Sequence, residues 1–270
     1  MNIRPPIFVL FSLFLVTPTA TAEIYLYHAT SDYGSGSDRD LGTSNGVYVG
    51  SPSSELSIEQ TTLQYNNGLT IEQTDFTGAW KTTTNQMQSL RFGLHYTDSD
   101  DEESNEKTTL IAETLYYPLD VYGSSLYYTK YKDDDVDVWQ LSPRAGRYFW
   151  PSVIPGTLYI ELLANAISIN TQNESATYVS IGLSSHWSVK QLHVELSTWL
   201  GQQRSAVTDG GFTIYNLNDI YEGELRFTTS LDISNQTSIK LSGKFNQRRA
   251  NENELAHLVS TLSLGLNHAF

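Results

Sequence analysis

The chain has 270 residues and a formal net charge of −14 at pH 7. A chain of this length can form one or two soluble domains or a single β-barrel. It contains no cysteine, which excludes disulfide frameworks, thiolate zinc sites and cysteine nucleophiles. The acidic balance argues against nucleic acid as a partner, because a protein that binds phosphate backbones needs a basic face.

The first part of the chain has the pattern of a secretory signal peptide. Arg4 supplies a positive charge, residues 7–16 are apolar, and small residues lead up to Ala22. The apolar run is well short of the ~20 residues that a membrane-spanning helix needs. We therefore expect residues 1–22 to be a signal peptide and residues 23–270 to form one domain.

After residue 22, apolar residues recur at every second position, which is the period of a β-strand. In the stretch ELRFTTSLDI, Leu225, Phe227 and Leu231 share one face, whereas Glu224 and Arg226 lie on the other. Such stretches are longer than the five or six residues of an average strand. They suit the ~9–11 residues that a tilted transmembrane strand needs. Periodicity alone does not say which face is inside, so a soluble β-sandwich must also be considered.

The alternation divides the domain into candidate strands. We expect them at residues 23–33, 44–50, 55–65, 69–82, 86–97, 107–117, 122–131, 138–149, 156–169, 175–188, 191–202, 221–232, 237–246 and 257–270. The strand at 44–50 is short, and its neighbours alternate with Thr and Gln rather than Leu and Val. Because closed bacterial barrels have even strand numbers, the count is 12 or 14.

The connections between these strands alternate in length. One set is mostly long and polar: residues 34–43, 66–68, 98–106, 132–137, 170–174, 203–220 and 247–256. The other set is tight: residues 51–54, 83–85, 118–121, 150–155, 189–190 and 233–236. Outer-membrane barrels have short periplasmic turns and longer external loops, whereas a sandwich has no reason to sort its loops in this way. We therefore predict an all-β fold, an antiparallel transmembrane β-barrel of about 12–14 strands over residues 23–270.

The last strand ends in STLSLGLNHAF, with an aromatic residue at the final position. This ending resembles the C-terminal assembly signal of Gram-negative outer-membrane proteins. Leu262, Leu264, Leu266 and Phe270 fit that signal, whereas His268 departs from it. The resemblance implies the outer membrane of a Gram-negative bacterium, with its lipid and lipopolysaccharide as surroundings. It also implies the barrel-assembly machinery as a partner, but no activity.

A second resemblance lies in LYYTKYKDDDVDVWQL, from Leu126 to Leu141. This stretch resembles the YaiO family of outer-membrane β-barrels, in which a Tyr-Thr-Lys-Tyr segment runs into an acidic loop and then a Trp-Gln pair. Elsewhere the agreement is limited to length, signal peptide and strand rhythm. The resemblance implies a barrel, and it brings no catalytic residues with it.

Several charges fall on the strand face opposite the apolar one, so we expect them to face the lumen. They are Arg91, Arg144, Glu161, Glu195, Glu224, Arg226, Lys240 and Lys244. They could line a channel and tune its ion selectivity, or they could form salt bridges that fill a closed barrel. The long connection 203–220 is the best candidate for a plug or a binding loop. Open and plugged barrels therefore remain equal alternatives.

Two connections carry acidic runs. One holds Asp98, Asp100, Asp101, Glu102, Glu103 and Glu106, and the other holds Asp133, Asp134, Asp135 and Asp137. Clustered carboxylates can bind divalent cations, which could link these loops to lipopolysaccharide. Neither run has EF-hand spacing, and the simpler interpretation is a solvated, self-repelling loop. We assign no metal ligands and expect no cofactor.

The residues that suggest catalysis or sugar binding also fit structural roles. His186 and Ser188 resemble the His-x-Ser of the outer-membrane phospholipase, but the Asn-rich surroundings of that site are absent. We therefore assign no catalytic residue and favour a protein that is not an enzyme. Aromatic residues near the strand ends are more typical of an interfacial girdle than of a sugar-stacking surface. They are Trp80, Trp139, Trp150, Trp187, Tyr96, Tyr117 and Tyr148.

These observations predict a porin-like channel or a structural barrel, with saccharides among the solutes considered. The alternatives are a barrel enzyme acting on lipid or glycan, and a surface-binding protein that uses its acidic external loops.

Overall fold

The computed structural model describes residues 22–34, 37–85, 87–101, 105–117, 120–131, 136–152, 155–171, 175–214, 219–249 and 255–270. Residues 1–21 of the expected signal peptide lie outside these ranges. Within them, no helix is long and apolar enough to cross a membrane.

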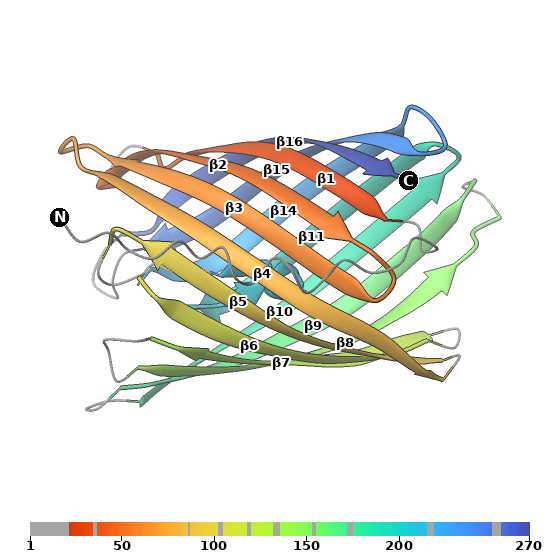
Figure 1. The fold of residues 1–270 in the computed structure, drawn as a ribbon, viewed down its shortest axis with the longest axis horizontal. Coiled ribbons are helices and arrows are strands. Elements are labelled where there is room, and N and C mark those ends of the chain that lie inside the picture. Colours follow the sequence, from red (N-terminus) through yellow and green to blue (C-terminus); the bar gives the residue numbers. More distant parts are fainter. Residues whose placement is uncertain are drawn as a thin grey trace.

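Fourteen antiparallel strands close into a barrel (Figure 1). They are β1 (Glu23–Asp32), β2 (Arg39–Gly50), β3 (Ser54–Tyr65), β4 (Thr70–Asn85), β5 (Gln88–Ser99), β6 (Lys107–Tyr116), β7 (Asp120–Lys130), β8 (Asp137–Phe149), β9 (Thr157–Asn170), β10 (Ser175–Val189), β11 (Leu192–Gln203), β14 (Ile220–Asp232), β15 (Thr237–Arg249) and β16 (His257–Ala269). Each strand pairs with its neighbours in chain order, and β11 pairs with β14. The predicted fold class is confirmed, and the higher of the two expected strand counts is correct.

The second strand begins at Arg39, five positions before the expected start at residue 44. Its first residues are polar, which is why alternation of apolar residues did not reveal them. Arg39 points inward, is 7% exposed, and pairs with Asp219 at 2.5 Å. An ion pair inside the barrel therefore replaces apolar burial at this end of β2.

The barrel closes through its first and last strands. β1 and β16 pair continuously from Glu23 opposite Ala269 to Asp32 opposite Ser260. The backbone N–H of Phe270 then donates to the carbonyl of Ala22 at 2.8 Å. Because an unpaired backbone group in lipid costs several kcal/mol, this closure removes the sheet edges that a bilayer would not tolerate.

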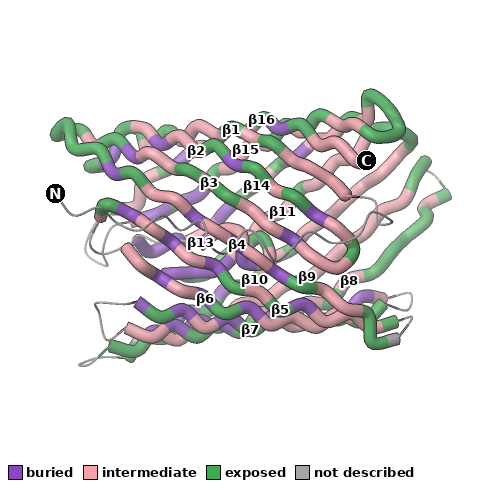
Figure 2. Tube along the Cα trace, in the orientation of Figure 1, coloured by how far each residue is buried: buried purple, intermediate pink, exposed green. Residues whose placement is uncertain are grey.

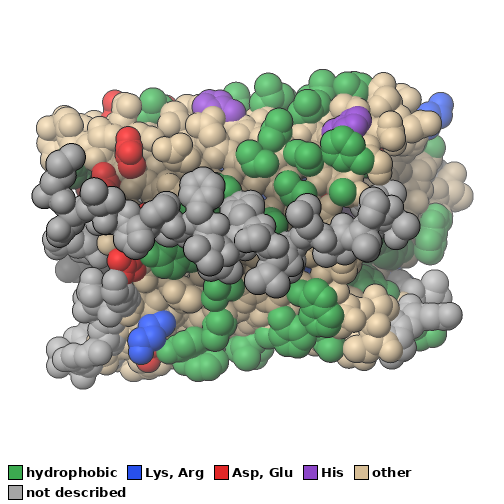
Figure 3. All heavy atoms as spheres, in the orientation of Figure 1, with side chains coloured by type: hydrophobic (Ala, Val, Ile, Leu, Met, Phe, Trp, Pro, Cys, Tyr) green, Lys and Arg blue, Asp and Glu red, His purple; other side chains and the backbone are tan. Residues whose placement is uncertain are grey.

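The two faces of the wall are sorted as in a membrane barrel. Large apolar side chains point outward, including Leu200 at 66% and Ile181 at 64% exposure. Charged side chains point inward, where Lys107 and Arg248 are almost fully buried. Figure 2 shows the resulting alternation of exposed and less exposed positions along the strands, and Figure 3 shows hydrophobic side chains gathered on the outer surface. This arrangement is the reverse of a soluble sandwich, which keeps its apolar face inside.

One part of the interior is nevertheless apolar. On β8, β9 and β10 the inward positions toward the loop end carry Val138, Ile167, Ile169 and Tyr178, all buried. These side chains need an apolar partner inside the barrel. The partner comes from the connection between β11 and β14, which contains Ala206.

Candidate functional site

The connection between β11 and β14 folds back into the barrel, where Figure 2 labels β13. It contains the short strands β12 (Val207–Thr208) and β13 (Thr213–Ile214), joined by a single turn, η2 (Asp209–Gly211). Ala206, Val207 and Ile214 are 1%, 3% and 8% exposed, values typical of a core rather than of a surface loop. We call residues 205–214 the lumen segment.

One side of the lumen segment is fixed to the wall formed by β6, β7 and β8. The Gln140 side chain accepts from the Val207 N–H at 2.7 Å and donates to the Val207 carbonyl at 2.8 Å. This amide therefore satisfies both backbone groups of a buried residue, as a neighbouring strand would. Val207 and Ile214 also pack against Ile111 of β6 and Tyr127 of β7.

The turn of the lumen segment depends on its Asp-Gly-Gly sequence. Asp209, Gly210 and Gly211 have φ angles of 50°, 68° and 94°, in the left-handed region that favours glycine. A Cβ atom on Gly211 would also collide with the Ile111 side chain. Glycine at this position thus permits both the backbone conformation and the close approach to the wall.

The other side of the lumen segment reaches different walls. Arg226 of β14 donates from Nη1 to Asp209 Oδ1 at 2.8 Å. Arg91 of β5 donates to the Gly210 carbonyl and pairs through Nε with Glu55 Oε2 at 2.7 Å. Contacts on several walls show that the segment bridges the lumen rather than lining one side of it.

Electrostatics reinforces the contact with β14. Burial alone would raise the pKa of Asp209, but the neighbouring Arg226 guanidinium outweighs it and lowers that pKa to about 2. The Asp209 carboxylate therefore stays ionised and paired through the neutral and mildly acidic range.

The return of the chain from the lumen to β14 is fixed by a buried ion cluster. Asp219, which is 2% exposed, accepts from Arg39 of β2 and from Arg248 of β15, each at 2.5 Å. The two guanidinium groups also lie over the Tyr33 ring, at 5.9 and 4.8 Å from its centroid. The two cations offset part of the penalty of burying this carboxylate, and burial still raises the pKa of Asp219 to about 6.

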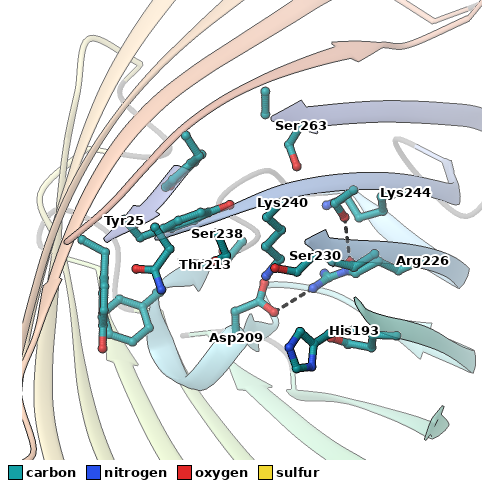
Figure 4. Close-up of a pocket in the computed structure, with 18 of the residues that line it drawn as sticks. Tyr25, His193, Asp209, Thr213, Arg226, Ser230, Ser238, Lys240, Lys244 and Ser263 are labelled. Atoms are coloured by element: carbon teal, nitrogen blue, oxygen red, sulfur yellow. Dashed lines mark hydrogen bonds and ion pairs between the residues drawn. The ribbon is translucent and has the colours of Figure 1, made fainter. Parts of the chain in front are cut away.

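The lumen segment leaves a cavity of about 750 Å³ along the other half of the barrel (Figure 4). Its lining comes mainly from β1, β14, β15 and β16, together with the turn of the lumen segment. The lining residues are Glu23, Tyr25, Tyr27, Ala29, Tyr48, Ser57, Glu59, His186, His193, Glu195, Asp209, Phe212, Thr213, Arg226, Thr228, Ser230, Asp232, Ser238, Lys240, Ser242, Lys244, Thr261, Ser263 and Asn267. Small hydroxyl side chains are frequent among them, which explains why space remains here.

Two tyrosines of β1 lie flat against the cavity wall, over glycines of the adjacent strands. A Cβ atom on Gly46 of β2 would collide with the Tyr27 ring, and one on Gly265 of β16 would collide with Tyr25. The two rings are nearly parallel, with 5.5 Å between their centroids and 21° between their planes. The glycines therefore leave the space in which the rings rest.

The expected lumen charges can now be placed. Glu195, Arg226, Lys240 and Lys244 line the cavity. Arg91 and Glu224 are buried at 7% exposure each, and Glu224 pairs with Arg226 at 3.2 Å. Arg144 pairs with Glu113 at 2.5 Å. Glu161 accepts from the Tyr159 hydroxyl at 2.9 Å.

Sequence reasoning missed several inward groups of equal importance. They are Arg39, Glu55, Glu59, Asp75, Asp209, Asp219 and Arg248. Some could have been found from the alternation of inward and outward positions along a strand, since Glu59 directly follows Ile58, which points outward. Asp209 and Asp219 carried no such signal, because they belong to a connection rather than to a strand.

The acidic runs are only partly described. Residues 102–104 and 132–135 lie outside the described ranges. Within those ranges, Asp100 accepts from the Glu72 N–H at 2.8 Å, and Asp137 accepts from the Tyr128 hydroxyl at 2.7 Å. The part of the chain that the structure describes has no group of three or more acidic or histidine residues able to hold a metal.

His186 lines the cavity, but the hydrogen bonds of Ser188 involve another histidine, His193. Ser188 Oγ lies 2.9 Å from His193 Nδ1, and His193 Nε2 lies 3.1 Å from Asp232 Oδ2. Acyl transfer by a hydrogen-bonded Ser-His-Asp series needs preorganised hydrogen-bond donors for the oxyanion. Ser188 is paired in the sheet with Thr157 on one side and His193 on the other. The backbone N–H groups of this strand therefore hydrogen-bond to the neighbouring strands and are not directed at an oxyanion. The arrangement therefore holds β10, β11 and β14 together at the rim.

The predicted girdle aromatics lie mainly on the outside. Trp80, Trp139, Trp150, Tyr117 and Tyr148 are exposed, at 42–66%. At the C-terminus Leu262, Leu264, Leu266 and Phe270 also point outward, with exposures of 43–63%.

No family model and no curated protein matches the chain. Solved structures do match its fold. The outer-membrane protein Omp33 of Acinetobacter baumannii is 12% identical in sequence and has a TM-score of 0.53; the match covers 93% of this chain and 99% of the Omp33 chain. A bacterial polysaccharide outer-membrane secretin is 11% identical, with coverages of 92% and 98% and a TM-score of 0.58. The anion-selective porin from Comamonas acidovorans is 10% identical, with coverages of 93% and 99% and a TM-score of 0.50. The chain thus has the fold of bacterial outer-membrane β-barrel proteins.

Proposed function

We propose that this protein is a porin-like channel of a Gram-negative outer membrane, narrowed by its lumen segment. The observation that carries the proposal is the polar cavity of about 750 Å³ that remains beside the segment. A barrel serving only as a scaffold has no need of a hydroxyl-lined space of that size. Small polar solutes, including saccharide units, fit both its volume and its lining.

The outward apolar face, the closed ladder and the shared fold support the outer-membrane location. We propose insertion by the barrel-assembly machinery, with Leu262, Leu264, Leu266 and Phe270 as its recognition signal. Membership of the YaiO family is also a proposal, and it rests on residues 126–141, of which 132–135 lie outside the described ranges. A barrel fold by itself is compatible with many activities, so transport must be tested directly.

Single-channel recording in planar bilayers tests the proposal. The full barrel should give small, steady conductance steps. A variant in which residues 205–214 are replaced by a short Gly-Ser linker should give steps several times larger, because the lumen segment would no longer cross the barrel.

The matched control replaces the connection 66–69, between β3 and β4, by a Gly-Ser linker of the same kind. That connection is exposed and lies outside the cavity lining, so its replacement should leave the steps unchanged. An absence of steps from both the parent and the segment-deleted barrel would refute a channel.

A further inference from the structure

The cavity contains a row of side chains that joins a cation, an aromatic ring and a carboxylate. Strand pairing places Lys240 opposite Gly265, Gly265 opposite Tyr27, Tyr27 opposite Gly46, and Gly46 opposite Glu59. The two glycines carry no side chain, so the row presents Lys240, Tyr27 and Glu59, and the space over the glycines is taken by the Tyr25 and Tyr27 rings.

The aromatic part of this row is held in place. The Tyr27 ring rests over Gly46, and its hydroxyl donates to Glu59. Tyr25 lies beside it, nearly parallel, over Gly265. Two rings fixed flat against a wall offer a surface on which the apolar face of a pyranose ring can stack with little loss of side-chain entropy.

Cationic groups border this aromatic surface on the side of β14 and β15. Lys240 Nζ lies 5.7 Å from the centroid of the Tyr25 ring, and Lys244 and Arg226 stand directly opposite each other on β15 and β14 (Figure 4). Arg226 is committed to Asp209, whereas Lys240 is seated over the aromatic surface. Glu59 borders the opposite side and can accept hydrogen bonds from sugar hydroxyls.

A row of small hydroxyls runs next to the aromatic surface. Thr228, Ser242 and Ser263 follow each other across the strands, and the hydroxyl oxygens of Thr228 and Ser242 are 3.0 Å apart. These groups leave space for a ring and can donate to it or accept from it. The chemistry is therefore asymmetric: aromatic below, hydroxyls beside, a cation at one edge and a carboxylate at the other.

We propose that Tyr25, Tyr27 and Lys240, with Glu59 opposite, form a binding subsite for a carboxylated sugar unit inside the channel. The pyranose ring would stack on the tyrosines, its carboxylate would face Lys240, and its hydroxyls would face Glu59 and the serines. A neutral sugar would lack the ionic contact, and a small carboxylate would lack the stacking. This inference rests on the proposed channel function, since the subsite would select solutes that enter the cavity.

Two measurements on the full barrel test it. The first is block of single-channel current by D-glucuronate, D-glucose and acetate at equal concentrations. The second is equilibrium binding of the same probes to the protein in detergent, which does not depend on conductance. Glucuronate should bind and block at least about tenfold more strongly than either of the others, because only it combines stacking with a charged contact.

Substitutions locate the effect. Lys240→Gln should lower the affinity for glucuronate about tenfold and bring it close to the affinity for glucose, whereas Tyr27→Leu should lower the affinity for both sugars. The control is Lys130→Gln, which removes the same charge from an exposed position on β7 outside the cavity lining, and should change nothing.

The possible failures can be told apart. If the barrel shows no conductance but binds glucuronate through Lys240, the channel is wrong and the subsite stands. If it conducts but binds glucuronate no better than glucose or acetate, the subsite is wrong and the channel stands. Equal loss of glucuronate binding in Lys130→Gln and Lys240→Gln would also overturn the subsite, since the effect would then be one of overall charge.

Discussion

Arg226 on β14 and Asp209 in the turn of the lumen segment are joined by a hydrogen-bonded ion pair of 2.8 Å. On the opposite side, the same segment is tied to β8 through Gln140. With Arg91 of β5, which donates to the Gly210 carbonyl, these contacts hold the segment at distant points of the wall, and it can leave the lumen only if all of them break. Several predictions about the channel depend on these attachments.

Asp209→Asn should make the channel noisier. The pair is partly exposed, with side-chain exposures of 22% and 43%, so its contribution is modest, about 0.2–1 kcal/mol. The population of barrels with a displaced segment should rise by up to about fivefold, seen as brief large-conductance openings in single-channel records. Arg226→Gln should act more strongly, because it also removes the contact with the buried Glu224, and the double variant should be no worse than Arg226→Gln alone.

Gln140→Ala should release the other attachment at greater cost. It leaves the N–H and C=O of the buried Val207 without their partners, which should cost about 2 kcal/mol or more. Trypsin cleavage after Arg204 in the folded protein should become faster, since the segment would open more often. Gln60→Ala, at an exposed position on β3, is the control. Equal cleavage rates in both variants would argue against a role for the Gln140 amide.

The Asp209 attachment should be insensitive to pH over a wide range. The pKa of Asp209 falls from its ordinary 3.8 to about 2 in the folded protein. A lowered carboxyl pKa stabilises the fold above the unfolded value, and this contribution is lost as the pH falls through about 2. The difference in openings between the parent and Asp209→Asn should therefore stay constant from about pH 8 to pH 4 and disappear only below about pH 3. A loss of that difference already near pH 5 would contradict this assignment.

Gly46→Ala should disturb the aromatic surface. The new Cβ would collide with the Tyr27 ring and push it into the cavity, so conductance should fall and the barrel should be destabilised by about 1–3 kcal/mol. Denaturant unfolding and single-channel recording measure the two effects. Gly243→Ala is the matched control, because no atom lies within 4 Å of the added carbon. Comparable losses in both variants would point to a general intolerance of the sheet.

Phe270→Ala should reduce the amount of barrel in the outer membrane of cells and leave refolding into detergent micelles almost unchanged. The Phe270 side chain is 63% exposed, so its packing contributes little, whereas the backbone pairing of β16 with β1 would remain. Membrane fractionation and heat-shifted gel mobility measure the two quantities. A parallel loss in refolding would mean that Phe270 stabilises the barrel rather than directing its assembly.

The strands could be predicted from the sequence because lipid on one side and polar groups on the other impose a period of two. The start of β2 was missed because Arg39 is balanced by an ion pair rather than by apolar burial. The lumen segment was recognised only as a candidate plug. A stronger signal was present on β9, where Ile167 and Ile169 share parity with Glu161 and so had to be apolar inside. The cavity side chains could not be grouped, since register across β14, β15, β16, β1 and β2 is set by three-dimensional closure.

The pairing of β1 with β16 has a consequence for how the protein is made. Residues at opposite ends of the domain, such as Glu23 and Ala269, are direct partners. Contacts of such large sequence separation form slowly, because most of the chain must be ordered before they can form. The nascent protein must therefore persist for some time as an incomplete sheet with two reactive edges. Its survival in that interval depends on keeping those edges from other chains, and we expect aggregation to be the dominant competitor of folding when β1 or β16 is weakened.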